Sequence, residues 1–107
     1  MKARISVLED GKQLFKEVEV ESIIEIKGRK LFFRIVPSPY DEYADLDEED
    51  EDWYKLSDWE SGWGFTQPMP DKDLCLEQAK SFFTKYGIEE IKRRADAAIA
   101  KDGRANE

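Results

Sequence analysis

Apolar and polar residues alternate along much of residues 3–36, a period-two pattern that is typical of antiparallel strands. Residues 3–9 form the first predicted strand. Asp10-Gly11 then suits a hairpin turn, because Gly accepts the positive φ that such turns require. A two-residue turn there would place Ile5 opposite Lys16, so we expect a bulge or a longer loop in this first hairpin.

The alternation is clearest over residues 17–27, which we predict to be one continuous strand with an apolar and a charged face. Gly28-Arg29 suits a two-residue turn with Gly first, and this turn predicts the register of a second hairpin. In that register apolar side chains meet on one face, and Glu25 lies opposite Phe32. The predicted pairs on the apolar face are Ile26 with Leu31, Ile24 with Phe33, and Ser22 with Ile35.

Two helices are predicted in the last third of the chain, after a further hairpin formed by residues 53–66. Asp71 or Asp73 can cap the first helix by accepting hydrogen bonds from the free N–H groups of its first turn. Gly87 is a natural residue to end it, and the second helix covers residues 88–101. The apolar residues lie three or four positions apart: Cys75, Ala79, Phe82 and Tyr86, widened by Leu76 and Phe83, then Ile88, Ile91, Ala95 and Ala98.

These elements predict an α+β fold, with a twisted antiparallel β-sheet of about 5–6 strands followed by two C-terminal α-helices. The 107 residues suit one small domain over residues 1–107. Pro37 and Pro39 end the strand pattern, and we expect a flexible acidic loop at about residues 40–52, where no periodicity is visible.

The charge of the chain is unevenly distributed. Its net charge is −8, and residues 41–60 hold eleven acidic residues and one basic residue, so this stretch accounts for the whole imbalance. The single cysteine, Cys75, cannot form an internal disulfide, and the first ten residues lack the apolar core of a signal peptide. No apolar run approaches the roughly 20 residues that cross a bilayer. We therefore expect a cytoplasmic protein without a membrane segment.

The sequence offers little catalytic or metal-binding chemistry. It contains no histidine, no Walker A loop, no GxGxxG and no GxSxG motif. A calcium loop starting at Asp45 would fail at its sixth position, Asp50, and at its twelfth, Leu56. Cys75 lies on the apolar stripe near acidic residues, so we interpret it as a core residue rather than a nucleophile. We predict that the protein is not an enzyme and uses no cofactor or metal.

Two groups of basic residues are interleaved with glutamates, and we interpret them as solvated faces. On the second predicted helix, Glu89 and Glu90 precede Arg93 and Arg94 by four residues, which favours ion pairs within the helix. The overall negative charge opposes direct contact with nucleic acid, so none is expected. The first group is Lys27, Arg29, Lys30 and Arg34, and the second is Lys92, Arg93 and Arg94.

The acidic run over residues 41–52 and the aromatic residues beside it are the best functional candidate. An array of carboxylates presents negative charge as a nucleic-acid backbone does, so it would attract a basic groove on a partner protein. Tyr and Trp at a surface often anchor such interfaces. The residues predicted to bind the partner are Asp45, Asp47, Glu48, Glu49, Asp50, Glu51 and Asp52, with Trp53 and Tyr54 as anchors.

In size, acidity and lack of catalytic motifs, the chain resembles the small acidic proteins with which phages and mobile elements block nucleases and host defence enzymes. The resemblance lies in composition, not in a motif, and it implies an anti-defence inhibitor that mimics nucleic acid. Two other interpretations stay open. One is a structural or accessory subunit, which could be a homodimer, with the acidic loop only solubilising. The other is a small enzyme that uses two convergent carboxylates.

Overall fold

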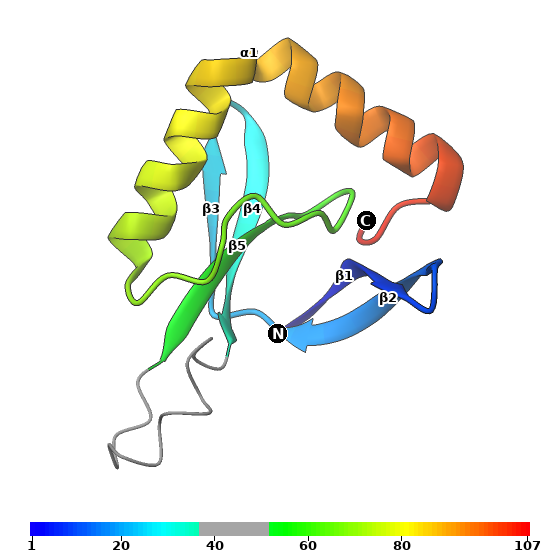
Figure 1. Cartoon of the computed structure of the whole chain (residues 1–107), viewed down its shortest axis with the longest axis horizontal. Helices are drawn as coiled ribbons and strands as arrows, with labels where there is room; N and C mark the ends of the chain where they lie inside the picture. The colour runs from blue at the N-terminus through cyan, green and yellow to red at the C-terminus, as the bar shows by residue number, and fades with distance from the viewer. Residues whose placement is uncertain (37–51) are drawn as a thin grey trace.

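The computed structural model describes residues 1–36 and 52–107 (Figure 1). Strands β1 (Lys2–Glu9) and β2 (Lys12–Glu19) form one antiparallel hairpin. Strands β3 (Ser22–Ile26), β4 (Arg29–Val36) and β5 (Trp53–Asp58) form a second antiparallel sheet in that order, and helix α1 (Lys72–Asp102) follows. The α+β class, with antiparallel strands before a C-terminal helix, is confirmed. The described strands make two sheets, so the prediction of one sheet of 5–6 strands is wrong.

The predicted strand over residues 17–27 is broken between Glu19 and Ser22. At the break, the N–H of Val20 donates to the carbonyl of Met1 at 2.9 Å, whereas the N–H of Glu21 donates to the carbonyl of Phe33 at 2.8 Å. The backbone therefore changes its partner from β1 to β4 within two residues. This change separates the hairpin from the three-stranded sheet, and periodicity alone does not reveal it because the apolar positions continue through the break.

Both hairpin turns consist of two residues with positive φ, which matches the right-handed twist of the flanking strands. In the first, Asp10 (φ 51°) and Gly11 (φ 76°) form the turn without a bulge, so the expected bulge or longer loop is wrong. Ile5 does lie opposite Lys16, and the register tolerates this pair because Lys16 is exposed and reaches Glu9 at 3.6 Å.

The second turn consists of Lys27 (φ 49°) and Gly28 (φ 82°), not of Gly28-Arg29. The register consequently shifts by two residues from the prediction, which leaves each side chain on its predicted face. Glu25 now lies opposite Lys30, a pair of opposite charges, instead of opposite Phe32. The observed pairs include Ile26 with Arg29, Ile24 with Leu31, and Ser22 with Phe33.

The predicted hairpin over residues 53–66 is only half formed. β5 is present, but residues 63–66 contact it through an isolated bridge between Ser57 and Gly64 rather than as a strand. A second bridge joins Tyr54 to Met69, just before α1 begins. The hydroxyl of Thr66 accepts a hydrogen bond from the N–H of Leu56 at 3.0 Å, so a side chain takes the place of a strand partner.

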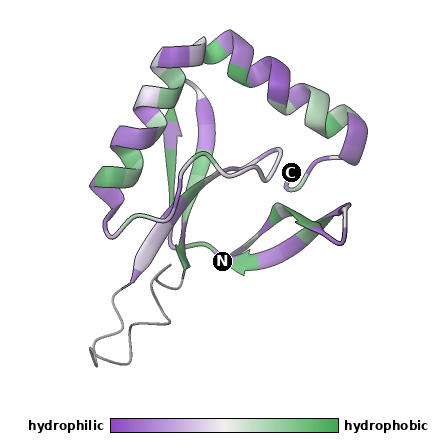
Figure 2. Ribbon diagram, viewed as in Figure 1, coloured by the Kyte–Doolittle hydropathy of each residue, from purple (hydrophilic) through white to green (hydrophobic). Residues whose placement is uncertain are grey.

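Helix α1 arches over the three-stranded sheet and then extends toward the β1–β2 hairpin (Figure 1). Asp71 caps its first turn by accepting from the N–H of Leu74 at 2.9 Å, and Gly103 ends it. At Gly87 the backbone is non-helical (φ 79°, ψ 154°), so the two predicted helices form one element that bends without a connecting loop. Apolar and polar bands recur along both halves (Figure 2). No helix in the described ranges is long and apolar enough to cross a membrane.

Two apolar clusters occupy the two faces of the three-stranded sheet. The first lies under α1, where the predicted helix stripe is buried or half-buried. The second lies between the sheet and the β1–β2 hairpin, where the rings of Phe32 and Trp59 meet edge to face at 5.7 Å. The first cluster is Leu31, Phe33, Leu56, Cys75, Ala79, Phe83 and Ile91, and the second is Ala3, Ile5, Phe32 and Trp59.

The residues after α1 tie the hairpin to the turn that follows β5. The guanidinium of Arg4 donates to the carbonyl of Ala105 at 2.6 Å, and the N–H of Ala105 donates to the carbonyl of Glu60 at 2.8 Å. The amide of Asn106 donates both to Arg4 and to Trp59, at 2.9 Å each. The hairpin is therefore held by hydrogen bonds as well as by its apolar face.

Candidate interaction surface

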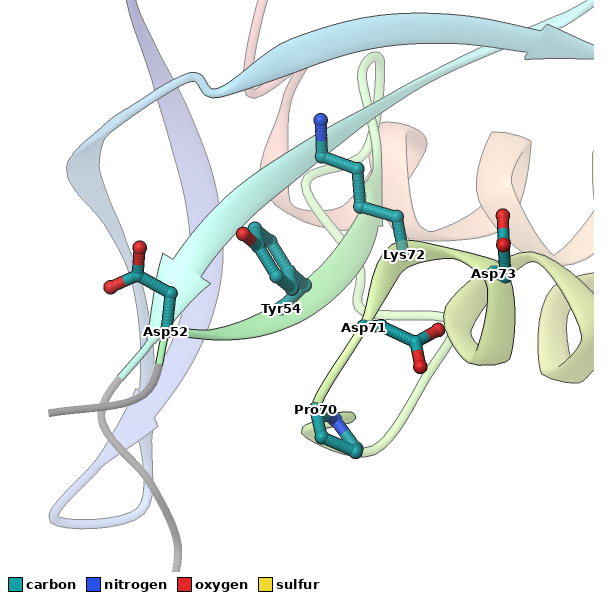
Figure 3. A pocket seen from close by; sticks show the side chains of 6 residues that line it. All are labelled: Asp52, Tyr54, Pro70, Asp71, Lys72 and Asp73. Atoms are coloured by element: carbon teal, nitrogen blue, oxygen red, sulfur yellow. The ribbon is translucent and has the colours of Figure 1, made fainter. Parts of the chain in front are cut away.

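A hollow of about 580 Å³ lies where the acidic run meets the first residue of β5 (Figure 3). The backbone brings its two walls together, because Tyr54 and Met69 exchange N–H to carbonyl hydrogen bonds at 2.8 and 3.0 Å. That exchange places the start of α1 beside the start of β5. The described residues that line the hollow are Asp52, Tyr54, Pro70, Asp71, Lys72 and Asp73.

The net charge of this lining is negative. Asp52, Asp71 and Asp73 are all exposed. Lys72 is the basic residue among them, and its Nζ lies 2.5 Å from a carboxylate oxygen of Glu21. This hydrogen bond holds the pKa of Glu21 below its usual value. The charge of Lys72 is thus matched by Glu21, and three carboxylates remain to set the electrostatics of the hollow.

The structure describes part of the predicted partner-binding set. Asp52 is exposed, and Trp53 and Tyr54 are half-buried. Tyr54 packs against the first apolar cluster, and its carbonyl accepts a hydrogen bond from the thiol of Cys75 at 3.1 Å. Tyr54 therefore contributes to the core as well as to the wall of the hollow. Asp45, Asp47, Glu48, Glu49, Asp50 and Glu51 lie outside the described residues.

Asp71 and Asp73 belong to the same acidic surface, although sequence reasoning assigned them only to helix capping. Asp71 does cap α1, but it also faces the hollow together with Asp52 (Figure 3). The two aspartates are distant in sequence from the acidic run. The bridge between Tyr54 and Met69 brings them to the same hollow. In the sequence, the signal for this was an acidic first helical turn only a short distance after β5.

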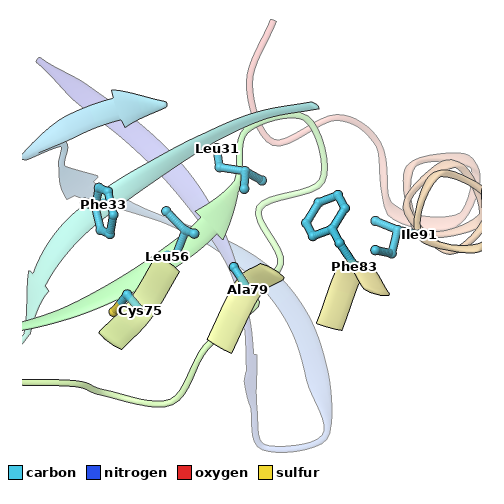
Figure 4. Close-up of a cluster of buried hydrophobic side chains, with 7 residues drawn as sticks. All are labelled: Leu31, Phe33, Leu56, Cys75, Ala79, Phe83 and Ile91. Atoms are coloured by element: carbon cyan, nitrogen blue, oxygen red, sulfur yellow. The ribbon is translucent and has the colours of Figure 1, made fainter. Parts of the chain in front are cut away.

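Cys75 is a core residue, as predicted. Its side chain is fully buried among Phe33, Leu56 and Ala79 (Figure 4). Burial raises the pKa of its thiol. A hydrogen bond from Thr66 opposes this effect more weakly, and the charge of Asp71 adds a still smaller upward contribution. A thiol with a raised pKa holds little thiolate at neutral pH, so it is a poor nucleophile.

The basic residues prove to be more heterogeneous than the sequence indicates. Arg29 is buried, only 8% exposed, and it binds the carboxylate of Asp58, so its assignment to a solvated face is wrong. On α1 the pair between Glu90 and Arg94 is confirmed at 3.0 Å. Arg93 binds Glu90 rather than the predicted Glu89 because Glu90 lies within reach of both guanidinium groups.

Within residues 1–36 and 52–107, no three His, Cys, Asp or Glu side chains are grouped so that they could hold a metal ion. Comparison of the chain with known protein families, with curated proteins and with solved structures finds no match. The function is therefore inferred from the charge, the surface and the chemistry of this chain alone.

Proposed function

We propose that this protein is a non-enzymatic acidic binding protein that occupies a basic, nucleic-acid-binding surface on a partner protein. It would act as an inhibitor of the kind that phages and mobile elements use. One observation carries the proposal: nine of the twelve residues at 41–52 are acidic, and the last of them, Asp52, lines a hollow together with Asp71 and Asp73. The negative charge thus continues from the run onto the first turn of α1.

The arrangement suits recognition of a basic groove. Carboxylates at high density raise the local concentration of a cationic partner and speed its encounter, and salt screens this attraction beyond roughly 10 Å. Tyr54 offers a half-buried aromatic wall beside the carboxylates. An aromatic anchor adds apolar contact that charge alone does not provide.

A second candidate function is that of an accessory subunit that forms a homodimer. Among the described strands, β3 pairs only with β4, so one edge of β3 has no partner among them. Ile23 on this strand is 39% exposed. An unpaired edge is a template for strand addition, and two copies could pair there. In this case the acidic run would be solubilising.

Affinity capture from a host-cell lysate tests the first candidate. The immobilised protein is compared with a variant in which the four residues Glu48, Glu49, Asp50 and Glu51 are changed to their amides. We expect a nucleic-acid-handling protein that is captured at low salt and released at high salt, with the variant binding it at least about tenfold more weakly. The purified partner should then lose its bound DNA when this protein is added.

A matched control separates the acidic run from net charge. Changing four exposed acids elsewhere, Glu25, Glu77, Glu89 and Asp96, to amides removes the same charge from other surfaces. Capture should survive in this control variant. Equal losses in both variants would contradict a specific role of the run. A dimer in sedimentation experiments, with association insensitive to salt, would support the second candidate instead.

A further inference from the structure

Arg34 on β4 and Lys55 on β5 are direct cross-strand partners in the three-stranded sheet. Partners of this kind hold their Cβ atoms about 5 Å apart on the same face of a sheet. Phe32, two residues before Arg34 on the same face, belongs to the cluster under the β1–β2 hairpin. The two cations therefore lie on the face opposite α1, next to the part of it that the hairpin covers.

Neither cation forms an ion pair with a carboxylate of the described residues. No carboxylate of residues 1–36 and 52–107 lies within 4.0 Å of either side chain, and both are half-buried. Burial lowers the pKa of Arg34, and burial together with the charge of Arg34 lowers the pKa of Lys55. Like charges directly opposite each other destabilise a sheet, so this pair costs stability.

Arg34 also carries an unusual hydrogen-bonding deficit. Its Nε is the one enclosed side-chain nitrogen or oxygen, within the described ranges, that lacks a hydrogen-bond partner. Enclosed polar groups nearly always have a partner, and an exception calls for a specific explanation such as a bound water or an ion. A guanidinium is also the side chain best suited to bind two oxygens of one anion.

The surroundings of Arg34 provide space for such an anion. Arg34 lines a hollow of about 170 Å³ together with Val18, Val20 and Ile35. At roughly 30 Å³ per water molecule, this hollow has the volume of about six waters. Two acids also line it, but each has its own cation: Glu19 lies 3.7 Å from the N-terminal amine, and Glu21 binds Lys72. Their charges are therefore largely matched, whereas that of Arg34 is not.

The geometry points to a binding site for a single phosphate group at the guanidinium of Arg34 in this hollow. Lys55 does not line the hollow, and its ammonium lies toward Gly64, so it adds charge from the neighbouring strand rather than a contact. A phosphate monoester carries a charge of roughly −1.5 to −2 at neutral pH, more than one carboxylate does, so a guanidinium with a second cation on the next strand attracts it more strongly. The net charge of −8 repels a polyanion, which favours a small phosphorylated compound or inorganic phosphate over nucleic acid. This site is independent of the proposed partner-binding surface.

Nuclear magnetic resonance with inorganic phosphate as the probe tests the site directly. Because Nε–H of an arginine gives its own ¹H–¹⁵N signal, titration with phosphate in a chloride buffer of constant ionic strength reports on Arg34 itself. We expect the Arg34 Nε–H signal and the backbone signals of residues 34 and 55 to shift and saturate. A linear drift over the whole spectrum without saturation would overturn the proposal.

Two variants supply a second readout. Phosphate at 50 mM should raise the melting temperature of the wild-type protein over chloride at equal ionic strength by about 2–4 °C. The change Arg34→Met should remove most of this shift, and Lys55→Met should remove a smaller part of it. Each should leave the melting temperature in chloride equal or higher, because it relieves an unpaired charge. Lys92→Gln, which removes an exposed cation on α1, serves as the control and should keep the shift.

Phosphate also stabilises proteins in general by exclusion from their surface. A shift that persists in all three variants would therefore overturn the specific site. A fourth variant, with Glu48, Glu49, Asp50 and Glu51 changed to amides, tests whether the chain's own carboxylates compete. Saturable phosphate binding that appears only in this variant would overturn the proposal of an external phosphate. Saturable binding in both this variant and the wild type would support it. Phosphoserine and a short single-stranded DNA then separate a small ligand from nucleic acid.

Discussion

Arg29 and Asp58 form a two-point ion pair inside the protein, with Nε 2.7 Å from Oδ1 and Nη2 2.9 Å from Oδ2. The side chains are 8% and 0% exposed. Oδ2 of Asp58 also accepts hydrogen bonds from the N–H and the hydroxyl of Ser61, at 2.8 and 2.6 Å. This single carboxylate thus links the start of β4, the end of β5 and the turn after it.

Removing one member of this pair should be costly, because the other charge would stay buried without a partner. We expect Asp58→Ala to lower the free energy of unfolding by about 3–5 kcal/mol, measured by urea denaturation. Glu60→Gln is the control, since Glu60 is 39% exposed and lies 3.5 Å from Arg29. It should cost less than about 1 kcal/mol. Similar losses in both variants would show that the buried pair has no special weight.

Gly62 lies against the first hairpin at a distance that only glycine permits. Its φ is +77°, and an added Cβ would lie 2.7 Å from the backbone nitrogen of Ser6 and 2.9 Å from Cβ of Ala105. The carbonyl of Gly62 accepts a hydrogen bond from that same nitrogen at 2.9 Å. The hairpin therefore depends on this close approach for its attachment to the turn after β5.

We expect Gly62→Ala to lower the free energy of unfolding by about 2–5 kcal/mol, of which about 1–2 comes from the positive φ and the rest from the clash. Gly28→Ala is a matched control, because Gly28 has φ +82° but nothing within 4 Å of an added Cβ. It should cost only about 1–2 kcal/mol. Urea denaturation measures the loss of unfolding free energy in both variants. Equal losses would mean that the hairpin moves away from the added methyl group without a loss of stability.

The sequence identified the class of the fold but not its register or its sheet boundaries, for a physical reason. The turns Gly28-Arg29 and Lys27-Gly28 differ by a two-residue register shift, which leaves every side chain on the same face. The hydrophobic pattern therefore cannot distinguish them. The meeting of Glu25 with Lys30, a pair of opposite charges, favours the observed turn.

The surface sites could be predicted from the sequence even less than the fold, because tertiary contacts bring their residues together. The acidic run and its end at Asp52 are visible in the sequence, but the position of Asp71 beside Asp52 follows from the Tyr54–Met69 bridge. Likewise, Arg34 and Lys55 become neighbours only through the pairing of β4 with β5. Residues outside the local periodicity can be assigned to a site only after the register is known.

Cys75 should be protected from thiol reagents in the native protein. It is fully buried, its thiol donates to the carbonyl of Tyr54, and its pKa is raised by burial. Reaction with a disulfide reagent such as DTNB requires both exposure and thiolate, so we expect it to be at least about 100-fold slower than in denaturant, as for a site that opens rarely. Equal rates with and without denaturant would contradict the buried position.

Glu90 should titrate far below its ordinary range. Hydrogen bonds from Arg93 and then Arg94 lower its pKa from 4.5 to about 2. Because the pKa is lower in the folded state, the stabilising contribution of Glu90 is fully present above pH 4.5 and is lost as the pH falls toward 2. Carboxyl ¹³C shifts should place the midpoint of Glu90 at about pH 2.

Two substitutions and a change of salt test the cause of this shift. Changing both Arg93 and Arg94 to Gln should raise the midpoint of Glu90 toward its ordinary value, while Lys92→Gln, at an exposed neighbouring position, should leave it low. Because the pairs lie at the surface, 1 M salt should raise the midpoint as well. In Glu90→Gln, the melting temperature should fall less between pH 4.5 and pH 2 than in the wild type. A midpoint that responds to neither the arginines nor salt would attribute the low pKa to another source.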